Sequence, residues 1–321
     1  MSAKTPVIPE KIEMIALDLD GTTLSRGHIT PRTRKALELA IEQGIQVVIA
    51  TGRVFAALPD DIFKIRGLRY VLTSNGAMMT DLERKDVIYM NCIGEEAVKK
   101  VTSALRSHPQ FPVEMFTDGQ AYIGRNYYDE LTEWGEACTY MSRAYVLRTR
   151  TPVENVYDYM DLHSTAIENI NIHFRNNEER MAMRELLEGI PEITLTSSMK
   201  LNIEVGGAST SKASGLAALC ELTGASLAHT MACGDSHNDM AMLEECGLGI
   251  AVGNAEAEVL EMADCIVPSN EEEGVAFAVE KYALQRERPQ WQLSILRVKN
   301  HTLSSCRRLA KKVLRRNSGR R

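Results

Sequence analysis

The sequence lacks the signals that mark secreted, membrane-spanning and zinc-binding proteins. No early segment combines a basic start with an apolar stretch of signal-peptide length, and no apolar run approaches the length of a membrane span. The seven cysteines are scattered and never spaced as CxxC, so neither a disulfide framework nor a zinc site is indicated. We therefore expect a cytoplasmic protein with reduced, buried thiols and no transmembrane segment.

Internal repeats and long low-complexity segments are also absent. The 321 residues are 44% hydrophobic and 25% charged, which is typical of a soluble protein with a real core. A chain of this length is expected to divide into two domains.

Negative charge dominates most of the chain but not its end. The formal net charge is −6, yet from Leu284 onward twelve Lys or Arg stand against one acid, Glu287, which gives this segment +11 and the remainder −17. This balance argues against nucleic-acid binding by the main body. The basic segment is either a contact for an anionic surface or a solvated, frayed terminus.

Short apolar runs alternate with helical segments in the first part of the chain. Strands are predicted at residues 14–19, 45–50 and 70–73, each ending in a small polar loop, and a helix over residues 30–43 begins at Thr30-Pro31. This alternation is typical of an α/β fold with a doubly wound parallel sheet, whose site lies at the carboxyl ends of the strands. Asp18, Thr51 and Asn75 should therefore lie on one rim.

The pattern changes after about Leu82 and returns near residue 206. The intervening segment predicts α+β structure, with helices at 95–107 and 177–188, a hairpin at 113–123 turning at Asp-Gly, and strands at 167–174, 193–197 and 201–205. Alternation then resumes with helices at 211–223 and 238–246 and strands at 229–233, 248–252 and 265–267. We predict a core of residues 1–84 and 206–284, an inserted cap domain of residues 85–205, and a basic extension of residues 285–321.

The first polar cluster is Asp18-Leu19-Asp20-Gly21-Thr22, where an apolar run breaks into a turn. Carboxylates at i and i+2 leave a strand on the same side, and Gly21 permits a sharp turn around whatever they hold. Asp18 could act as a nucleophile and Asp20 could transfer protons, but two charges so close need a cation or a shared proton. The alternative is a purely structural Asp-Gly turn.

Two further clusters offer groups that bind anions. In Thr51-Gly52-Arg53, a hydroxyl and backbone N–H groups at a helix start could hold phosphate oxygens, although Thr51 could instead be an N-cap. Lys212 stands near the start of a small, apolar helix, where its charge opposes the helix dipole unless an anion compensates. An ordinary exposed lysine is the competing interpretation.

The fourth cluster, Gly234-Asp235-Ser236-His237-Asn238-Asp239, follows another apolar strand. It supplies two more carboxylates and an amide, and ligand sets made only of oxygen suit Mg²⁺. For Asp239, capping the next helix or supporting the site is the alternative to direct ligation.

Together, and in this order, the four clusters resemble the haloacid-dehalogenase (HAD) superfamily of phosphohydrolases. The placement of the insert resembles the Cof-type branch, which has a large α/β cap between its second and third motifs. The resemblance covers roughly residues 12–283, judged by element order. The basic extension after residues 270–282 departs from the family pattern.

The resemblance implies a role for each matching residue. Asp18 attacks phosphorus to form an aspartyl-phosphate, and Asp20 protonates the leaving alkoxide and later activates water. Thr51, with Gly52 beside it, and Lys212 hold phosphoryl oxygens, and Asn238 touches phosphate or orders its loop. Mg²⁺ is bound by Asp18, the backbone carbonyl of Asp20 and Asp235, with Asp239 in support.

Three functions follow as hypotheses. The first is a Mg²⁺-dependent phosphatase of small phosphorylated metabolites, such as sugar phosphates or phosphorylated cofactors, because a metal and Lys212 would offset the repulsion between Asp18 and a phosphate dianion. The second is a phosphomutase with the same aspartyl-phosphate chemistry. The third is a non-catalytic sensor of phosphometabolites that signals through the basic extension. In the cap, five side chains are possible substrate contacts outside any motif, and surface or packing roles are the alternative: Tyr122, Arg125, Asn126, His163 and His173.

Overall fold

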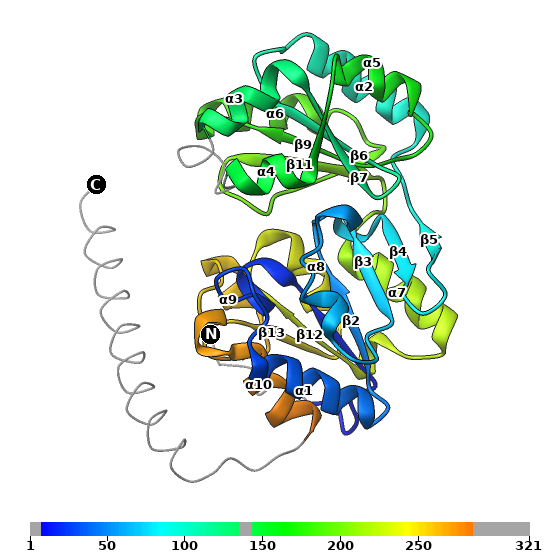
Figure 1. Ribbon diagram of the computed structural model, residues 1–321, viewed down its shortest axis with the longest axis vertical. Coiled ribbons are helices and arrows are strands. Elements are labelled where there is room, and N and C mark those ends of the chain that lie inside the picture. Colours follow the sequence, from blue (N-terminus) through cyan, green and yellow to red (C-terminus); the bar gives the residue numbers. More distant parts are fainter. Residues whose placement is uncertain (1–7, 135–142, 285–321) are drawn as a thin grey trace, which may run out of the picture. The chain divides into compact units, whose positions relative to one another are not determined.

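The core is built on an eight-stranded sheet (Figure 1). The computed structural model describes residues 8–134 and 143–284, so the basic extension 285–321 lies outside the described residues. The strand order is β14-β13-β12-β1-β2-β3-β4-β5, parallel from β14 to β3 and antiparallel from β3 to β5. The strands are β1 (Met14–Leu17), β2 (Gln46–Ala50), β3 (Tyr70–Thr73), β4 (Met78–Asp81), β5 (Asp86–Met90), β12 (Thr230–Gly234), β13 (Leu248–Ala251) and β14 (Cys265–Ile266).

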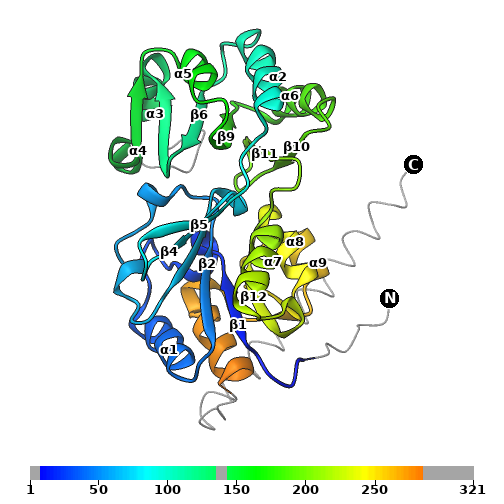
Figure 2. The same ribbon diagram turned by 90° about the vertical axis from the view of Figure 1, so that its right-hand side faces the viewer.

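Helices cover both faces of this sheet. α1 (Pro31–Glu42) lies on one face, and α7 (Lys212–Thr223), α8 (Met240–Glu245) and α9 (Ala257–Met262) lie on the other (Figure 2). A short helix, α10 (Gly274–Ala278), packs against α1. The predicted start of α1 is confirmed, because the Thr30 hydroxyl accepts the backbone N–H of Thr33 and Pro31 occupies the first helical position. The doubly wound α/β prediction is therefore confirmed.

A second sheet of six strands belongs to the inserted segment. Its order is β10-β11-β9-β6-β7-β8, and five helices among the described residues accompany it. The predicted hairpin turn is confirmed, since Asp118 and Gly119 both take left-handed backbone angles, with φ of 50° and 69°. The elements are β6 (Val113–Thr117), β7 (Gln120–Gly124), β8 (Arg150–Val153), β9 (Ile167–His173), β10 (Ile193–Thr196), β11 (Asn202–Gly207), α2 (Glu95–Arg106), α3 (Arg125–Trp134), α4 (Arg143–Thr149), α5 (Val156–Leu162) and α6 (Asn177–Glu188).

The two faces of the second sheet differ in chemistry. One face packs apolar side chains such as Met115 and Ile170 into a core beneath α2, α5 and α6. The other face carries buried polar side chains, because cross-strand partners share a face and Glu114 pairs with Asn171, which pairs with Glu204. Burying polar side chains costs free energy unless they are hydrogen-bonded, and Asn171 bonds to both Glu114 and Asn202 on this face.

The division of the chain into core and cap remains a proposal. Because β5 joins the core sheet, we propose that the cap begins after Met90 rather than at residue 85. In the part of the chain that the structure describes, no helix combines the length and apolarity needed to cross a membrane.

Candidate active site

Three parallel strands bring the first polar groups together. β1 pairs with β12 on one side and β2 on the other, with Leu17 aligned to both Cys233 and Ile49. The residues that follow these strands therefore emerge side by side at the carboxyl edge of the sheet. Asp18, Thr51 and Asp235 stand in these positions, and β3, next along the sheet, leads into Asn75.

Lys212 lies at the centre of this edge. It is the first residue of α7, which Ser211 and Ser214 start with a reciprocal capping box. Its side chain is fully buried, and Nζ donates hydrogen bonds to Asp18 Oδ1 at 2.6 Å and Asp239 Oδ1 at 2.7 Å. The interpretation of Lys212 as an ordinary exposed lysine is therefore wrong.

The turn after Asp18 approaches Asp235 closely. Thr22 Oγ1 donates to Asp235 Oδ1 at 2.6 Å. Gly21 has a φ of 78°, and a Cβ at this position would collide with the Asp235 carboxylate. Only glycine meets both demands, the left-handed backbone and the missing side chain.

Both carboxylate oxygens of Asp239 are engaged in hydrogen bonds. Its Oδ2 accepts the backbone N–H groups of Asp235 and Ser236 at 2.9 and 3.1 Å, while Oδ1 accepts Lys212. Between the two alternatives for Asp239, this geometry favours support of the loop and the lysine over direct ligation.

The cluster carries excess negative charge. Oxygens of Asp18, Asp235 and Asp239 lie within 4.8 Å of one another, against the single ammonium of Lys212. Burial, opposed by Lys212 and reinforced by Asp239, raises the pKa of Asp18 well above its usual range. Burial and then Asp239 raise the pKa of Asp235 to about 7, although the Thr22 hydrogen bond opposes this. Such a set of carboxylates is electrostatically prepared for a cation.

Asp20 differs from Asp18 in its surroundings. Its side chain is 56% exposed and forms a bidentate ion pair with Arg53, with both N···O distances 2.6 Å. Burial lowers the pKa of Arg53, but its hydrogen bonds to Asp20, together with the charges of Tyr145 and Asp20, raise this pKa overall. Arg53 belongs to the second motif, but nothing in the sequence indicates its ion pair with Asp20.

The loop after β2 is not a helix start. Thr51 Oγ1 accepts the backbone N–H of Arg53 at 3.1 Å in a tight turn, and the next helical segment is the single turn Phe55–Ala57. The expected helix at this motif was therefore wrong, because hydroxyl-to-backbone bonding favours a turn. A side chain at Gly52 would crowd the amides of Asn75 and Asn238, since its Cβ would lie 3.0 Å from Asn75 Oδ1 and 3.4 Å from Asn238 Nδ2.

Sequence reasoning missed a group of cap residues that contact this edge. Ser74 Oγ donates to Glu168 Oε2 and Asn75 Nδ2 donates to Glu204 Oε2, each at 2.5 Å. Both glutamates are buried and come from strands β9 and β11. In the sequence, the only sign of these contacts was the presence of polar Asn and Glu residues in predicted strands.

Glu168 allows a prediction about stability and pH. Burial raises its pKa, and the hydrogen bonds from Ser74 and Gly119 only partly oppose this. Because its pKa is higher in the folded than in the unfolded protein, Glu168 contributes its full stability below the unfolded-state pKa of about 4.5. This stability is lost as pH rises through the folded-state pKa. We expect Glu168→Gln to reduce the fall in the free energy of unfolding between pH 5 and pH 8, measured by urea unfolding. Glu185→Gln, at an exposed site on α6, is the control, and an unchanged slope in Glu168→Gln would contradict the prediction.

Of the five cap side chains considered from sequence, only His173 lies on the buried polar face. Its Nε2 is 3.4 Å from Glu114 Oε2. Tyr122 and His163 flank the Tyr159 ring instead, with centroid distances of 4.7 and 4.3 Å. Arg125 and Asn126 are exposed.

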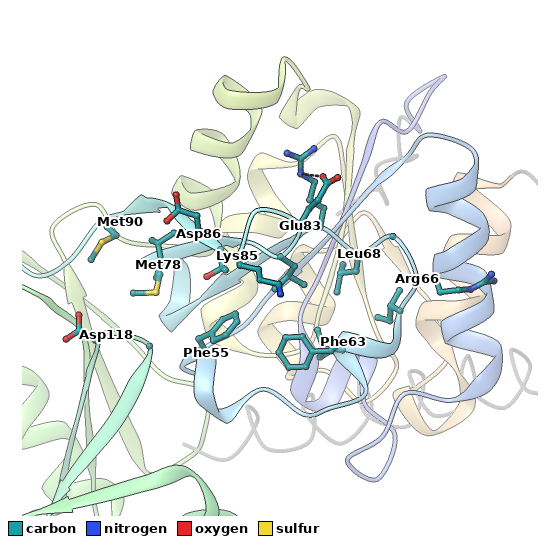
Figure 3. Close-up of a pocket in the computed structure, with 18 residues that line it drawn as sticks. Phe55, Phe63, Arg66, Leu68, Met78, Glu83, Lys85, Asp86, Met90 and Asp118 are labelled. Carbon is teal, nitrogen blue, oxygen red and sulfur yellow. Dashed lines mark ion pairs between the residues drawn. The ribbon is translucent and has the colours of Figure 1, made fainter.

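A large cavity lies elsewhere in the described residues. It has a volume of about 1120 Å³ and is lined by residues such as Phe55, Phe63, Leu68, Met78 and Lys85 (Figure 3). None of Asp18, Lys212 and Asp235 lines it. We place the chemistry at the carboxyl edge of the sheet because titratable groups converge there.

Known proteins resemble this chain in both architecture and sequence. A family model described as haloacid dehalogenase-like hydrolase matches residues 15–279. Two Bacillus subtilis proteins are each 30% identical to this chain: 5-amino-6-(5-phospho-D-ribitylamino)uracil phosphatase YcsE, over 85% of this chain and 96% of its own, and phosphatase YwpJ, over 83% and 98%. The solved structure of a haloacid dehalogenase-like hydrolase from B. subtilis superposes with a TM-score of 0.73 at 27% identity, covering 84% of this chain and 99% of that one. This chain therefore belongs to the haloacid dehalogenase-like hydrolase family, in its Cof-type branch, and is a phosphatase.

Proposed function

We propose that the protein is a Mg²⁺-dependent phosphatase that hydrolyses small phosphorylated metabolites through an aspartyl-phosphate on Asp18. The observation that carries this proposal is the convergence of Asp18, Asp235 and the buried Lys212 at the carboxyl edge of the sheet. Phosphoryl transfer of this kind requires a carboxylate nucleophile, a positively charged side chain and oxygen ligands for a metal ion. Asp18, Lys212 and Asp235 could supply these groups.

The first half of the reaction forms a bond between an Asp18 oxygen and phosphorus. The phosphorus–oxygen bond to the leaving group breaks, and Asp20 gives that oxygen a proton. Lys212 has three N–H donors, two of which bind Asp18 and Asp239, so the third can hold a phosphoryl oxygen. Thr51 would bind a second oxygen through its hydroxyl proton.

The second half returns the enzyme to its starting state. Asp20 takes a proton from water as the water oxygen attacks phosphorus, and the bond to Asp18 breaks to release phosphate. Asp20 is half exposed, so water can reach it, and Arg53 holds it by both carboxylate oxygens. We infer that Arg53 stabilises the carboxylate form of Asp20, which acts as the base in this second half, and that Asp20 is protonated and released from Arg53 when it acts as the acid in the first half.

The donor set fits a hard divalent cation. Asp18, the backbone carbonyl of Asp20 and Asp235 would hold Mg²⁺. This assignment is supported by the raised pKa of Asp235, about 7, which burial and the neighbouring Asp239 cause. When bound, Mg²⁺ would neutralise charge between Asp18 and the phosphoryl group.

The substrate class is proposed as sugar phosphates or phosphorylated cofactors. One relative is named for a phosphorylated ribitylaminouracil, whose leaving group is rich in hydroxyls. The buried polar face of the cap sheet, with Asn169, Asn171 and Asn202, suits recognition of such a group. A cytoplasmic location is in keeping with the free cysteines among the described residues.

Metal removal provides the direct test. We expect chelation with EDTA to reduce phosphate release from a generic aryl phosphate by about 100-fold or more, because Asp18 and Asp235 then repel the substrate. Added Mg²⁺ should restore it, whereas undiminished turnover after chelation would contradict the metal role. A panel of phosphorylated metabolites with and without Mg²⁺ then identifies the substrate, and a hexose 1-phosphate that isomerises without free phosphate would instead indicate a mutase.

A further inference from the structure

Three consecutive residues after β3 have left-handed backbone conformations. Ser74, Asn75 and Gly76 have φ values of 50°, 56° and 102°. This conformation is unfavourable for serine and costs asparagine less. Such a turn persists only where its surroundings hold it, and backbone strain of this kind often accompanies function.

On the core side, this turn contacts the segments that carry the phosphate-binding candidates. The backbone N–H of Ser74 donates to Arg53 O at 2.9 Å, and that of Asn75 donates to Thr51 O at 3.1 Å. Asn238 Nδ2 donates to Asn75 Oδ1 at 3.0 Å. A side chain on Gly76 would collide with the backbone of Ser211, the residue before Lys212.

On the cap side, the same turn is bound by two buried carboxylates. Asn75 Nδ2 donates to Glu204 Oε2, and Ser74 Oγ donates to Glu168 Oε2. Glu204 is itself held, since its Oε1 accepts Asn202 Nδ2 at 3.0 Å and the Ser198 hydroxyl. The Asn75 side chain therefore forms the middle of one hydrogen-bonded chain from Asn238 to Glu204.

We propose that Asn75 is a positioning residue that makes the alignment of Thr51 and Asn238 depend on Glu204 of the cap. This inference rests on the proposed function, since it adds a regulator of the same site. The amide suits the task because one end accepts from the core while the other donates to the cap. Hydrogen bonds in such a chain strengthen one another, so a change at Glu204 reaches Asn238 through Asn75.

The test is a set of variants in which one hydrogen bond is broken and then reversed. In Asn75→Asp, one carboxylate oxygen still accepts the hydrogen bond from Asn238. The amide group that donates to Glu204 is replaced by the other carboxylate oxygen, which cannot donate. We expect it to lower kcat for the aryl phosphate by about 10- to 100-fold, with less than about a threefold change in KM. Adding Glu204→Gln supplies a new donor, and the double variant should recover to within about threefold of wild type.

A matched control separates the hydrogen bond from charge. Asn75→Asp combined with Glu168→Gln has the same net charge as the first double variant but leaves Glu204 facing the new carboxylate. Rescue by Glu204→Gln alone supports the proposal, whereas equal rescue by both, or by neither, overturns it. Thermal unfolding of every variant identifies any loss that is due to misfolding.

Orthophosphate affinity in the presence of Mg²⁺, measured by calorimetry, tests the same coupling without turnover. It should weaken in Asn75→Asp and recover only with Glu204→Gln, and equal affinity in all variants overturns the inference. If wild type binds orthophosphate but releases none from any ester, the proposed function fails while the positioning role is still decided by binding. If wild type turns over and rescue fails, only the positioning role fails.

Discussion

Replacing Asp18 with asparagine is expected to lower phosphate release by about 1,000-fold or more. The side chain keeps its size and its position after β1, but a neutral amide oxygen cannot attack phosphorus and form the covalent intermediate. A 1,000-fold loss corresponds to about 4 kcal/mol of transition-state stabilisation. Initial rates of an aryl phosphate with saturating Mg²⁺ measure it.

The stability of this variant should move in the opposite direction to its activity. Asp18 is buried beside Asp235 and Asp239, and removing one of these charges relieves repulsion in the metal-free protein. Lys212 does not become an unpaired buried charge, because it keeps its ion pair with Asp239. The exposed Asp60→Asn variant serves as the control, with unchanged turnover. Normal turnover by Asp18→Asn would refute the assignment of the nucleophile.

Lys212→Met is expected to abolish activity and to destabilise the fold. Methionine matches the length of the buried stem but leaves Asp18 and Asp239 without the ammonium that both accept. Breaking a buried ion pair by removing one partner costs roughly 3–5 kcal/mol in the free energy of unfolding. Because burial raises the pKa of Asp18 and Lys212 opposes that rise, loss of the ammonium is expected to favour the protonated, non-nucleophilic form of Asp18.

Urea unfolding and aryl phosphate turnover measure the two effects of Lys212→Met. Lys35→Met, at an exposed position on α1, should change neither quantity appreciably. A Lys212→Met protein as stable as wild type would show that the ammonium is not needed to compensate these carboxylates. Retained turnover would show that it does not hold the phosphoryl group.

The sequence was most informative where local rules act alone. Short β-branched runs predicted the parallel core strands to within a few residues, although the antiparallel strands β4 and β5 were not predicted. Because parallel strands deliver their following residues to one edge, Asp18, Thr51 and Asn75 could be placed on one rim. The start of α1 at Thr30-Pro31 followed from capping preferences.

The remaining features depend on partners far away in the chain. The ion pair of Asp20 with Arg53 and the contact of Asn75 with Glu204 join segments 33 and 129 residues apart, and no local pattern reports such pairs. The loop after β2 misled the prediction because Thr-Gly suits both an N-cap and a hydroxyl-closed turn. Only the tertiary structure distinguishes them.

Under the proposed function, the two faces of the cap sheet would divide substrate recognition from folding. Side chains such as Ile170 and Ile172 anchor the strands to α2, α5 and α6, whereas their neighbours Asn169 and Asn171 point to the opposite face. Substitutions on the polar face would then alter ligand preference while the apolar core on the other face stays intact. A scaffold of this kind lends itself to divergence, because new specificities arise without rebuilding the domain that carries them.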